Sequence, residues 1–522
     1  MNNGRIRIIC DLKPTGNIEQ DEQIIPKIIQ TTLPYHQQNL EDIIRLRNYY
    51  YNKTDIQAKQ KTQQPSINNK IAIDYANEAV NTINGYSFAN ALTFSSRRTD
   101  NEDAMKAFND SLDDDNYSRK LKQIALNYGI CGLAYKYVIP ANEEELEDGY
   151  YYKTVADLEP ENTYCVYDNT IEKEKICAIH FYDRKVYNSN LQNYQSQRVY
   201  NVWTKWHQWT FVSGQSATSS VYKAIPFNVD GQDVKAYPLI YNTIPIIEYR
   251  SLDGTSYFEL AIDLINAINA LASARVDDVQ QSVDYIILLR DIDTESDGAL
   301  DKIKKCISEG ILSFRSIQGL AIQPSIDVLN TKLNQSEIQT LQDFLCDKLE
   351  EILNIPNRNS KSSGGDTGSA VESRNGFRSL ENKASIVTDD IIAGENDALK
   401  VIFKICNNIS SCPFKNMKPK DIEIKDNRNK YENLSTASTA YNVLREAGMN
   451  DRTALEVTRL APDSITVSKL NEQQKEKDLE FTLRKEKLLA EVNSNDIENG
   501  SSQPNNKMAT NNGSNSKESE NK

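Results

Sequence analysis

Apolar residues between positions 258 and 283 recur every three or four residues, which is the spacing of one face of a helix. They are Phe258, Ile262, Ile265, Ile268, Ala272, Val276, Val279 and Val283. No Gly or Pro interrupts the segment, so the pattern predicts a helix of roughly 26 residues and about 40 Å. Its first half is apolar nearly all round, and such a helix needs other helices to pack against. The pattern indicates a structural element before it indicates an enzyme.

Strand-like segments flank this helix. An apolar stretch at Ile244–Tyr249 and a turn at Asp253–Gly254 precede it, and a second apolar run, Tyr285–Leu289, follows it. Beyond that run come one short helical pattern and two strand-like runs, at Gly298–Ser308, Gly310–Phe314 and Gly319–Ile322. A second long helix is predicted from about Asn334 to Ile352. The central architecture is therefore a helix, a small α/β insert and another helix.

A polar loop follows the second helix. Residues 357–369 contain no apolar residue and three glycines, which predicts a flexible loop. Helical patterns resume at residues 370–408, with a possible kink at Gly394, and continue at 433–447, 451–459 and 467–492. Residues 493–522 hold almost nothing to bury and are expected to be disordered.

The N-terminal half is predicted to be helical first and β-rich afterwards. Residues 1–40 are polar, with isolated Ile pairs and prolines, and are expected to form an extended arm. Helical patterns cover residues 40–51, 69–84 and 103–127, and Gly85 is expected to end the second of them. Short segments rich in Tyr, Val, Ile and Trp then predict strands. They are Leu133–Ile139, Thr163–Tyr167, Cys177–Asp183, Arg198–Trp206 and Thr210–Val212.

Composition narrows the class of protein. A chain of 522 residues has room for roughly two to four domains. Its net charge of −14 argues against a tight, non-specific DNA binder, because such proteins neutralise phosphates with basic patches. No run approaches the roughly 18 apolar residues that span a bilayer, and the N-terminus lacks the apolar core of a signal peptide. We expect the chain to stay in the cytoplasm where it is made.

Catalytic motifs are absent from the sequence. It contains no P-loop, no GxSxG and no HExxH. The residues around its three histidines, His36, His180 and His207, do not suggest a catalytic site. The eight cysteines form no CxxC pair, so buried thiols are favoured over a zinc site. The carboxylates at Asp113–Asp115 and Glu143–Glu147 lack the spacing of a calcium loop, and a solvated surface is their simpler interpretation. We expect no catalytic residue, no metal ligand and no cofactor.

Four stretches, taken in their order along the chain, carry a resemblance to a known family and cover roughly residues 40–470. The first reads LRNYYYNKTDIQAKQ and NNKIAIDYANEAVNTINGYSFANALTF, with Asn69, Gly85 and Tyr86 at their familiar points. The second is the strand IPIIEY with the helix ELAIDLINAINALASARVDDVQQSVDYIILLRD. The others are GSAVESRNGFRSLENKA and REAGMNDRTALEVTRLAPDS. In this order the four stretches resemble the Gp6-like family of bacteriophage portal proteins from tailed phages.

The resemblance implies an α+β, mainly helical protomer that forms a ring with a central channel. Its expected parts are an N-terminal arm (1–40), a wing (41–250), a first stem helix (251–285), a clip (286–328), a second stem helix (329–356), a tunnel loop (357–369), a wing helix (370–420), a crown (421–492) and a disordered tail (493–522).

The resemblance also implies a function. Twelve copies are expected at one capsid vertex of the virion, assembled in the host cytoplasm, as a channel for double-stranded DNA during packaging and ejection. Expected partners are the terminase large subunit, a head-completion or adaptor protein, the major capsid protein and scaffold, with no membrane. Weak, sequence-independent DNA contacts are expected from the tunnel loop, and partner docking from the clip. The tunnel-loop residues are Arg358, Lys361, Ser362, Gly364 and Gly365, and the clip residues are Lys302, Lys304, Lys305 and Arg315.

Other interpretations remain open. The loop at 357–369 has the composition of an ordinary linker, and the basic residues of the clip have the spacing of a solvated helix face. A metal-dependent nucleic-acid-processing enzyme would use the Asp113–Asp115 carboxylates. A head-assembly or scaffold protein that forms no channel is a third possibility, and it leaves the loop without a role.

Overall fold

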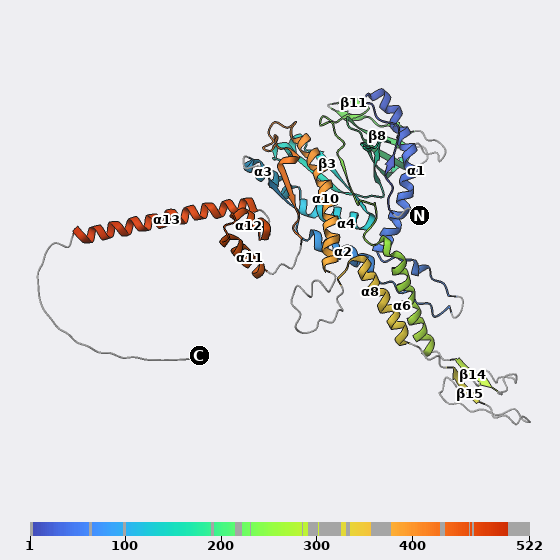
Figure 1. Cartoon of the computed structure of the whole chain (residues 1–522). Coiled ribbons are helices and arrows are strands. Elements are labelled where there is room, and N and C mark those ends of the chain that lie inside the picture. Colours follow the sequence, from blue (N-terminus) through green and yellow to red (C-terminus); the bar gives the residue numbers. More distant parts are fainter. Residues whose placement is uncertain are drawn as a thin grey trace, which may run out of the picture. The chain divides into compact units, whose positions relative to one another are not determined.

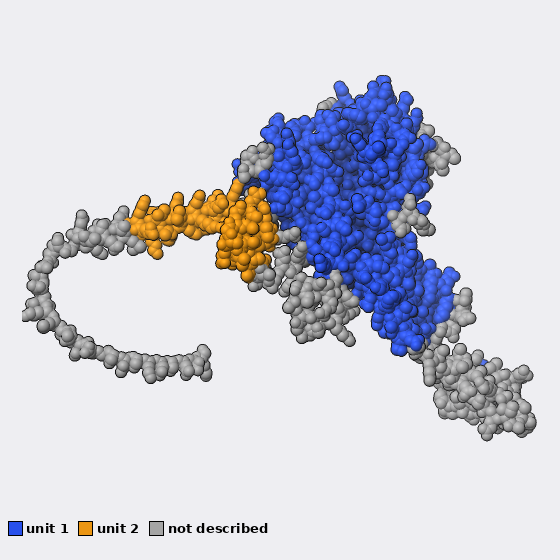
Figure 2. Space-filling view, viewed as in Figure 1, with its two compact units in different colours: residues 1–430 blue, residues 431–522 orange. Residues whose placement is uncertain are grey.

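The computed structural model describes residues 4–61, 65–97, 101–188, 193–213, 222–229, 231–283, 286–290, 301, 325–329, 335–356, 377–428, 434–458, 460–461 and 464–498. The chain divides into two compact units, Met1–Lys430 and Tyr431–Lys522 (Figures 1 and 2). The expected α+β, mainly helical character is confirmed.

A seven-stranded sheet occupies one part of the first unit. Its order is β1-β5-β6-β7-β8-β12, with β9 also paired to β8. All of its pairings are antiparallel except that of β1 with β5. The strands are β1 (Ile8–Ile9), β5 (Thr163–Tyr167), β6 (Lys175–Asn188), β7 (Asn193–Trp203), β8 (His207–Ser213), β9 (Tyr222–Ala224) and β12 (Tyr237–Pro238). The strands predicted within β5, β6, β7 and β8 are thus confirmed, except that β7 ends at Trp203.

Helix α1 (Ile18–Tyr50) covers this sheet, so the extended arm expected for residues 1–40 is wrong. The isolated Ile pairs are in fact a helix face, because Ile25, Ile28 and Ile29 are fully buried against the strands. Asn17 caps the helix by accepting hydrogen bonds from the amides of its first turn. Pro26 and Pro34 lie inside α1 and each removes one backbone donor. Packing on the sheet outweighs that loss.

A second, three-stranded sheet supports the helices that surround it. Its order is β13-β3-β4, all antiparallel. The strands are β3 (Leu133–Pro140), β4 (Tyr152–Leu158) and β13 (Ile246–Arg250). Helices α2 (Tyr75–Phe88), α4 (Tyr117–Cys131) and α10 (Phe377–Cys406) pack around this sheet and share one hydrophobic core with it (Figure 1).

Smaller elements complete the first unit. They are α3 (Glu102–Asp114), α5 (Glu143–Glu147), the 3-10 helices η1 (Asp55–Ala58), η2 (Glu259–Ala261) and η3 (Pro419–Asp421), and the pairs β2 (Thr93–Ser96) with β16 (Ile422–Lys425) and β10 (Phe227–Val229) with β11 (Gln232–Val234). Because β16 pairs with β2, residues 421–430 belong to this unit and not to the C-terminal region expected to begin at 421.

Two long helices run side by side in the first unit (Figure 1). They are α6 (Ile262–Val283), which directly follows η2, and α8 (Gln335–Leu353). Strand β14 (Ile286–Arg290) follows α6, and β15 (Ser325–Leu329) precedes α8. The two strands pair antiparallel, with Arg290 opposite Ser325. The chain therefore leaves α6 and returns to α8 through one two-stranded sheet, and the predicted order of helix, insert and helix is confirmed at both ends of the insert.

The second unit is helical. It contains α11 (Leu434–Glu446), α12 (Asp451–Thr458) and α13 (Ser464–Glu498). Gly448, between α11 and α12, has a φ of +87°, which glycine adopts without strain. Helix α13 continues six residues beyond the predicted end at 492, so residues 493–498 do not belong to the tail expected to be disordered.

Gly85 does not end α2, contrary to prediction. The helix continues to Phe88, because Ser87 and Phe88 are buried in the core and extend the stripe that begins at Ala76. The predicted start of this helix at residue 69 was also wrong, because α2 begins at Tyr75 and residues 69–73 precede it.

Candidate functional site

Helix α6 is fastened to the segment before α2 by three polar side chains spaced four residues apart. Each accepts a hydrogen bond from a backbone amide of residues 69–73. The bonds run from Ile73 N to Asn269 Oδ1 (2.9 Å), from Ile71 N to Ser273 Oγ (2.9 Å) and from Asn69 N to Asp277 Oδ1 (2.7 Å). We call this arrangement the polar ladder.

The periodicities of the two segments explain why the ladder forms. Four helical residues advance about 6 Å, and two residues of extended chain advance about 6.6 Å, so every second amide meets every fourth side chain. The two segments run in opposite directions, since Asn269 meets Ile73 and Asp277 meets Asn69. Asn269, Ser273 and Asp277 are all buried, and the bonds satisfy polar groups that burial would otherwise leave without partners.

Asp277 is the most heavily bonded member of the ladder. Its carboxylate also accepts hydrogen bonds from Lys59 Nζ (2.8 Å) and Asn69 Nδ2 (2.8 Å), and Lys61 Nζ lies 3.7 Å away. Burial by itself would raise the pKa of this carboxyl, but the hydrogen bonds from Lys59 and Asn69 outweigh it and lower the pKa to about 2. The residue is therefore charged at neutral pH and fixes the end of the ladder.

Helix α8 is held to α6 by a different kind of contact. Arg275 Nη1 donates a 2.8 Å hydrogen bond to Gln339 Oε1 and a second bond to Gln342 on α8. Tyr75 Oη of α2 contacts Cys346 Sγ at 3.3 Å. Leu349 and Leu353, near the C-terminal end of α8, are buried. The two long helices are thus joined to each other and to the helical core.

Apolar side chains elsewhere on this helix pair are exposed. Leu341 (50%), Phe344 (56%) and Ile352 (50%) of α8 and Val279 (47%) of α6 retain about half of their accessible surface. Large apolar side chains grouped on one helix pair are typical of a surface that another protein surface covers.

Arg5, near the N-terminus of the chain, holds the segment before α6 in place. Arg5 is 1% exposed, and its guanidinium pairs with Glu259 in η2. Its backbone amide donates to Gly254 O (2.9 Å), and Arg250 donates to its carbonyl. Gly254 has a φ of +73° and approaches the Arg5 backbone so closely that a Cβ would not fit. The turn between β13 and α6 is therefore built around Arg5.

A buried ion pair fixes α10 to the three-stranded sheet. Lys136 Nζ of β3 lies 2.7 and 2.9 Å from the two carboxylate oxygens of Glu395, and Tyr249 Oη donates to Glu395 Oε1 at 2.7 Å. Lys136 and Glu395 are 2% and 3% exposed. A Cβ on the neighbouring Gly394 would overlap the Tyr249 ring, so glycine is required for this close packing.

Every site residue named from the sequence lies outside the described residues. This applies to the expected tunnel-loop residues Arg358, Lys361, Ser362, Gly364 and Gly365, and to the expected clip residues Lys302, Lys304, Lys305 and Arg315. The structure does define the segments from which both regions begin. The expected clip residues lie, along the chain, between β14 and β15, and the expected tunnel loop follows α8.

The acidic stretches considered as metal ligands are part of the described chain. Asp115 accepts a hydrogen bond from Thr154 N (2.9 Å) and pairs with Lys120. Glu145 forms a capping box with Asn142 at the start of α5. Across the described ranges, no three His, Cys, Asp or Glu side chains are grouped to hold a metal ion. Asp115, the last residue of this stretch, thus has a structural role.

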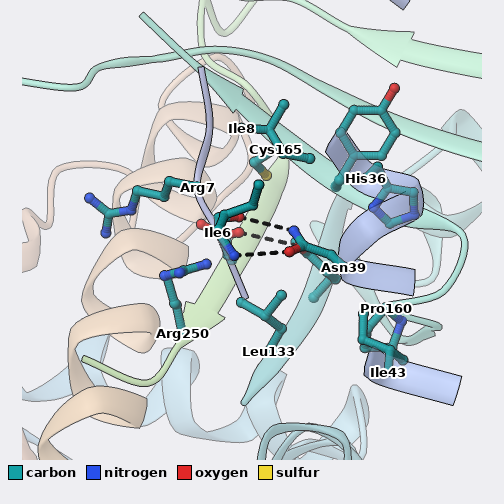
Figure 3. Close-up of a pocket in the computed structure, with 13 residues that line it drawn as sticks. Ile6, Arg7, Ile8, His36, Asn39, Ile43, Leu133, Pro160, Cys165 and Arg250 are labelled. Carbon is teal, nitrogen blue, oxygen red and sulfur yellow. Dashed lines mark hydrogen bonds between the residues drawn. The ribbon is translucent and has the colours of Figure 1, made fainter. Parts of the chain in front are cut away.

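One pocket lies between α1, β1 and the two sheets (Figure 3). The Asn39 side chain projects into it and forms two 2.9 Å hydrogen bonds with the Ile6 backbone. His36 contacts Glu161 O at 2.8 Å, and burial lowers its pKa. The cavity has room for roughly one water molecule. It is a packing feature of the N-terminal strand and too small for an organic ligand.

The polar ladder was missed from the sequence alone, although a signal is present. Asn269, Ser273 and Asp277 recur every four residues beside the apolar positions Ile262, Ile265, Ile268 and Ala272. Such regular polar positions indicate that another segment lies along the helix.

Among helices in the described ranges, none is sufficiently long and apolar to cross a membrane.

Comparison with known proteins identifies the family. No curated protein matches the chain. The model of one family, described as phage portal protein, SPP1 Gp6-like, matches residues 30–478 of the 522. That range includes α2, the polar ladder, the α6–α8 pair, α10, α11, α12 and the first part of α13. The chain therefore belongs to the SPP1 Gp6-like family of phage portal proteins.

Proposed function

We propose that twelve copies of this chain form a ring at one capsid vertex, through which double-stranded DNA enters during packaging and leaves during ejection. The observation that carries the proposal is the α6–α8 pair of long helices. The polar ladder fastens α6 to residues 69–73, Arg275 joins α6 to α8, and the strands β14 and β15 that adjoin the two helices pair with each other. In the proposed ring these helices are the stem around the channel. Residues 41–250 and 370–420 form the wing, and unit 2 corresponds to most of the crown.

Exposed apolar side chains on the stem support assembly. Leu341, Phe344 and Ile352 of α8 keep about half of their surface accessible in one copy. Contact with the next copy removes that surface from water, which stabilises association by about 25 cal/mol for each Å² buried. A head-to-tail contact of this kind closes into a ring when the rotation between copies fits. The number twelve comes from the family resemblance.

Electrostatics supports a channel that releases DNA. The chain carries a net charge of −14, and acidic walls repel phosphates over a Debye length of about 8–10 Å. Arg358 and Lys361, with Ser362, Gly364 and Gly365 around them, are proposed to supply the weak contacts of the tunnel loop. Weak, sequence-independent contacts allow DNA to slide without being held.

The insert between β14 and β15 is proposed as the clip. Its cations Lys302, Lys304, Lys305 and Arg315 would receive acidic surfaces of the terminase large subunit during packaging, and of a head-completion or adaptor protein afterwards. The major capsid protein and scaffold would surround the wing as the head assembles in the host cytoplasm. ATP hydrolysis is assigned to the terminase, and none to this chain.

The test is DNA packaging into procapsids reconstituted with or without this chain. Procapsids that contain the chain are expected to protect DNA from nuclease when terminase and ATP are present, and those without it are not. Equal protection in both preparations would contradict the proposed function. Packaging abolished by charge reversal at Lys304 and Lys305, with rings intact, would support the clip assignment.

A further inference from the structure

Strands β6 and β7 extend beyond the sheet as a two-stranded ribbon. Strand β5 pairs with β6 only as far as His180, and β8 pairs with β7 only from Val199 onward. Among the described residues, 183–188 and 193–198 therefore pair only with each other. At about 3.4 Å per residue, the ribbon extends roughly 20 Å. Two-stranded ribbons are marginally stable in water, which favours a surface that covers this one.

Side-chain contacts give the ribbon a defined shape. Arg198 Nε and Nη2 each lie 2.8 Å from an oxygen of Asp183 on the opposite strand, and the guanidinium stacks 5.1 Å from the Phe181 ring. Toward the tip, the Tyr187 and Tyr194 rings meet with their centroids 5.3 Å apart. Such a pre-formed ribbon loses little conformational entropy when it docks.

Aromatic and basic side chains are prominent among the exposed residues of the ribbon. Tyr187 and Tyr194 are 54% and 65% exposed, and Lys185 is exposed on the same face. Arg184 and Val186 are exposed on the other face. Asp183, the carboxylate that Arg198 engages, is the one acidic residue among the ribbon's described positions. The ribbon is thus locally cationic in a chain of net charge −14.

A second surface of the chain has the opposite charge. The C-terminal end of α3 and helix α5 both contact the start of β4. Ser111 Oγ of α3 contacts Tyr152 Oη at 3.3 Å and Asp115 accepts a hydrogen bond from the Thr154 amide, while Lys153 Nζ donates to Glu145 Oε1 of α5 at 2.7 Å. We call their exposed carboxylates the acidic face. They are Asp110, Asp113, Asp114, Glu143, Glu144, Glu147 and Asp148, with Tyr150 exposed beside them.

We infer that the β6–β7 ribbon of one copy docks on the acidic face of the next copy. A closed ring needs two different, complementary surfaces on each chain, and these two surfaces are complementary in charge. Copies with a charge of −14 repel one another, so contact between them is favoured where one presents cations. The inference rests on the proposed ring and adds to it the surfaces that join its subunits. It also gives the acidic stretches a role other than metal binding.

The test is reciprocal charge reversal in the full-length chain, read out by mass photometry and negative-stain electron microscopy. Arg184→Glu with Lys185→Glu is one variant, and Glu143→Lys with Glu147→Lys is the other. Each alone is expected to raise the subunit concentration at half-assembly by about tenfold or more, because like charges then meet. The two sets combined are expected to restore assembly toward wild type.

A matched control separates this contact from net charge. Lys27→Glu with Lys122→Glu makes the same change in charge as the ribbon variant, at exposed positions of α1 and α4, and is expected to leave assembly unchanged. Rings of the wild type that are insensitive to both reversals, or reversals that the combined variant does not rescue, overturn the docking inference alone. A wild type that forms no rings overturns the proposed function and this inference together. A folding defect is distinguished from lost contact because the combined variant rescues only the latter.

Discussion

The backbone amide of Asn69 donates a 2.7 Å hydrogen bond to the carboxylate of Asp277, and the Asn69 side chain donates a second one of 2.8 Å. These residues are 208 positions apart in the chain. Their contact joins the segment before α2 to the middle of a long helix proposed to line a DNA channel. Forces on that helix would therefore reach the wing through the polar ladder.

Removing the Asp277 carboxylate is expected to loosen the ladder. Asp277→Ala leaves the Asn69 amide and the Lys59 ammonium without their shared acceptor, at a cost of about 1–3 kcal/mol. Hydrogen exchange, followed by mass spectrometry, should speed up in the peptide containing residues 69–73. Asp278→Ala, one position along the same helix, is the control and should leave this peptide protected. Equal protection in both variants would show that the ladder does not hold the segment.

The same carboxylate predicts a pH dependence. Its folded-state pKa is about 2, below the ordinary value of 3.8, so the stabilisation is fully present above pH 3.8 and is lost as the pH falls toward 2. Asp277→Asn cannot titrate and should lose less stability than the wild type over this window. Urea unfolding at several pH values measures the difference. Parallel curves for the two proteins between pH 4 and 2 would contradict the assignment.

Two glycines in helices should respond to alanine in opposite ways. At Gly85, in α2, nothing lies within 4 Å of the added Cβ, so Gly85→Ala should stabilise the fold by about 0.5–1 kcal/mol. At Gly394, in α10, the added Cβ meets the Tyr249 ring, and Gly394→Ala should cost about 1–3 kcal/mol. Thermal unfolding of both variants tests the pair. A stabilised Gly394→Ala protein would show that α10 does not pack this closely on β13.

Removing one partner of the buried ion pair between Lys136 and Glu395 is expected to destabilise the fold strongly, because it leaves the other charge buried without its partner. Lys136→Met leaves a buried carboxylate whose remaining neighbour is the Tyr249 hydroxyl, which should cost about 3–5 kcal/mol. Replacing both residues, as Lys136→Met with Glu395→Leu, should cost less than the sum of the single changes. A double-mutant cycle from urea unfolding measures this coupling. Additive losses would mean that the two charges do not interact.

The tunnel loop is expected to affect packaging and not assembly. Deleting residues 360–368 removes Lys361 and the glycines but leaves α8 and α10 intact. Rings should still form, and the yield of nuclease-protected DNA should fall because copies lose their weak contacts with the duplex. Changing Arg358 and Lys361 to Ala tests the charge separately from loop length. Equal packaging yield after the deletion would contradict the proposed role.

Periodicity predicted a helix correctly where one apolar face determines which residues are buried. It failed where contacts with other segments determine the secondary structure. The apolar stripe from Ile262 to Val283 was sufficient to predict α6. The prolines of residues 1–40 suggested an extended arm, whereas Ile25, Ile28 and Ile29 pack on the sheet and keep α1 helical. Gly85 was predicted to end α2, but burial of Phe88 extends the helix.

Contacts between distant segments were not predictable from one sequence. Four-residue spacing places Asn269, Ser273 and Asp277 on one helix face, but nothing in it identifies residues 69–73 as the segment opposite. The acidic stretches at α3 and α5 likewise both contact β4, through Asp115 with Thr154 and Glu145 with Lys153, and nothing in their sequence spacing indicates this shared strand. The tunnel-loop and clip residues remain predictions from the family resemblance.

The most direct test of the proposed ring is electron microscopy of the purified chain combined with mass photometry. The proposed function predicts particles of about twelve copies of the 59.2 kDa chain, each with a central opening wide enough for a DNA duplex. Particles without an opening would contradict it. So would a chain that stays monomeric or dimeric at micromolar concentration, both alone and with its capsid and scaffold proteins.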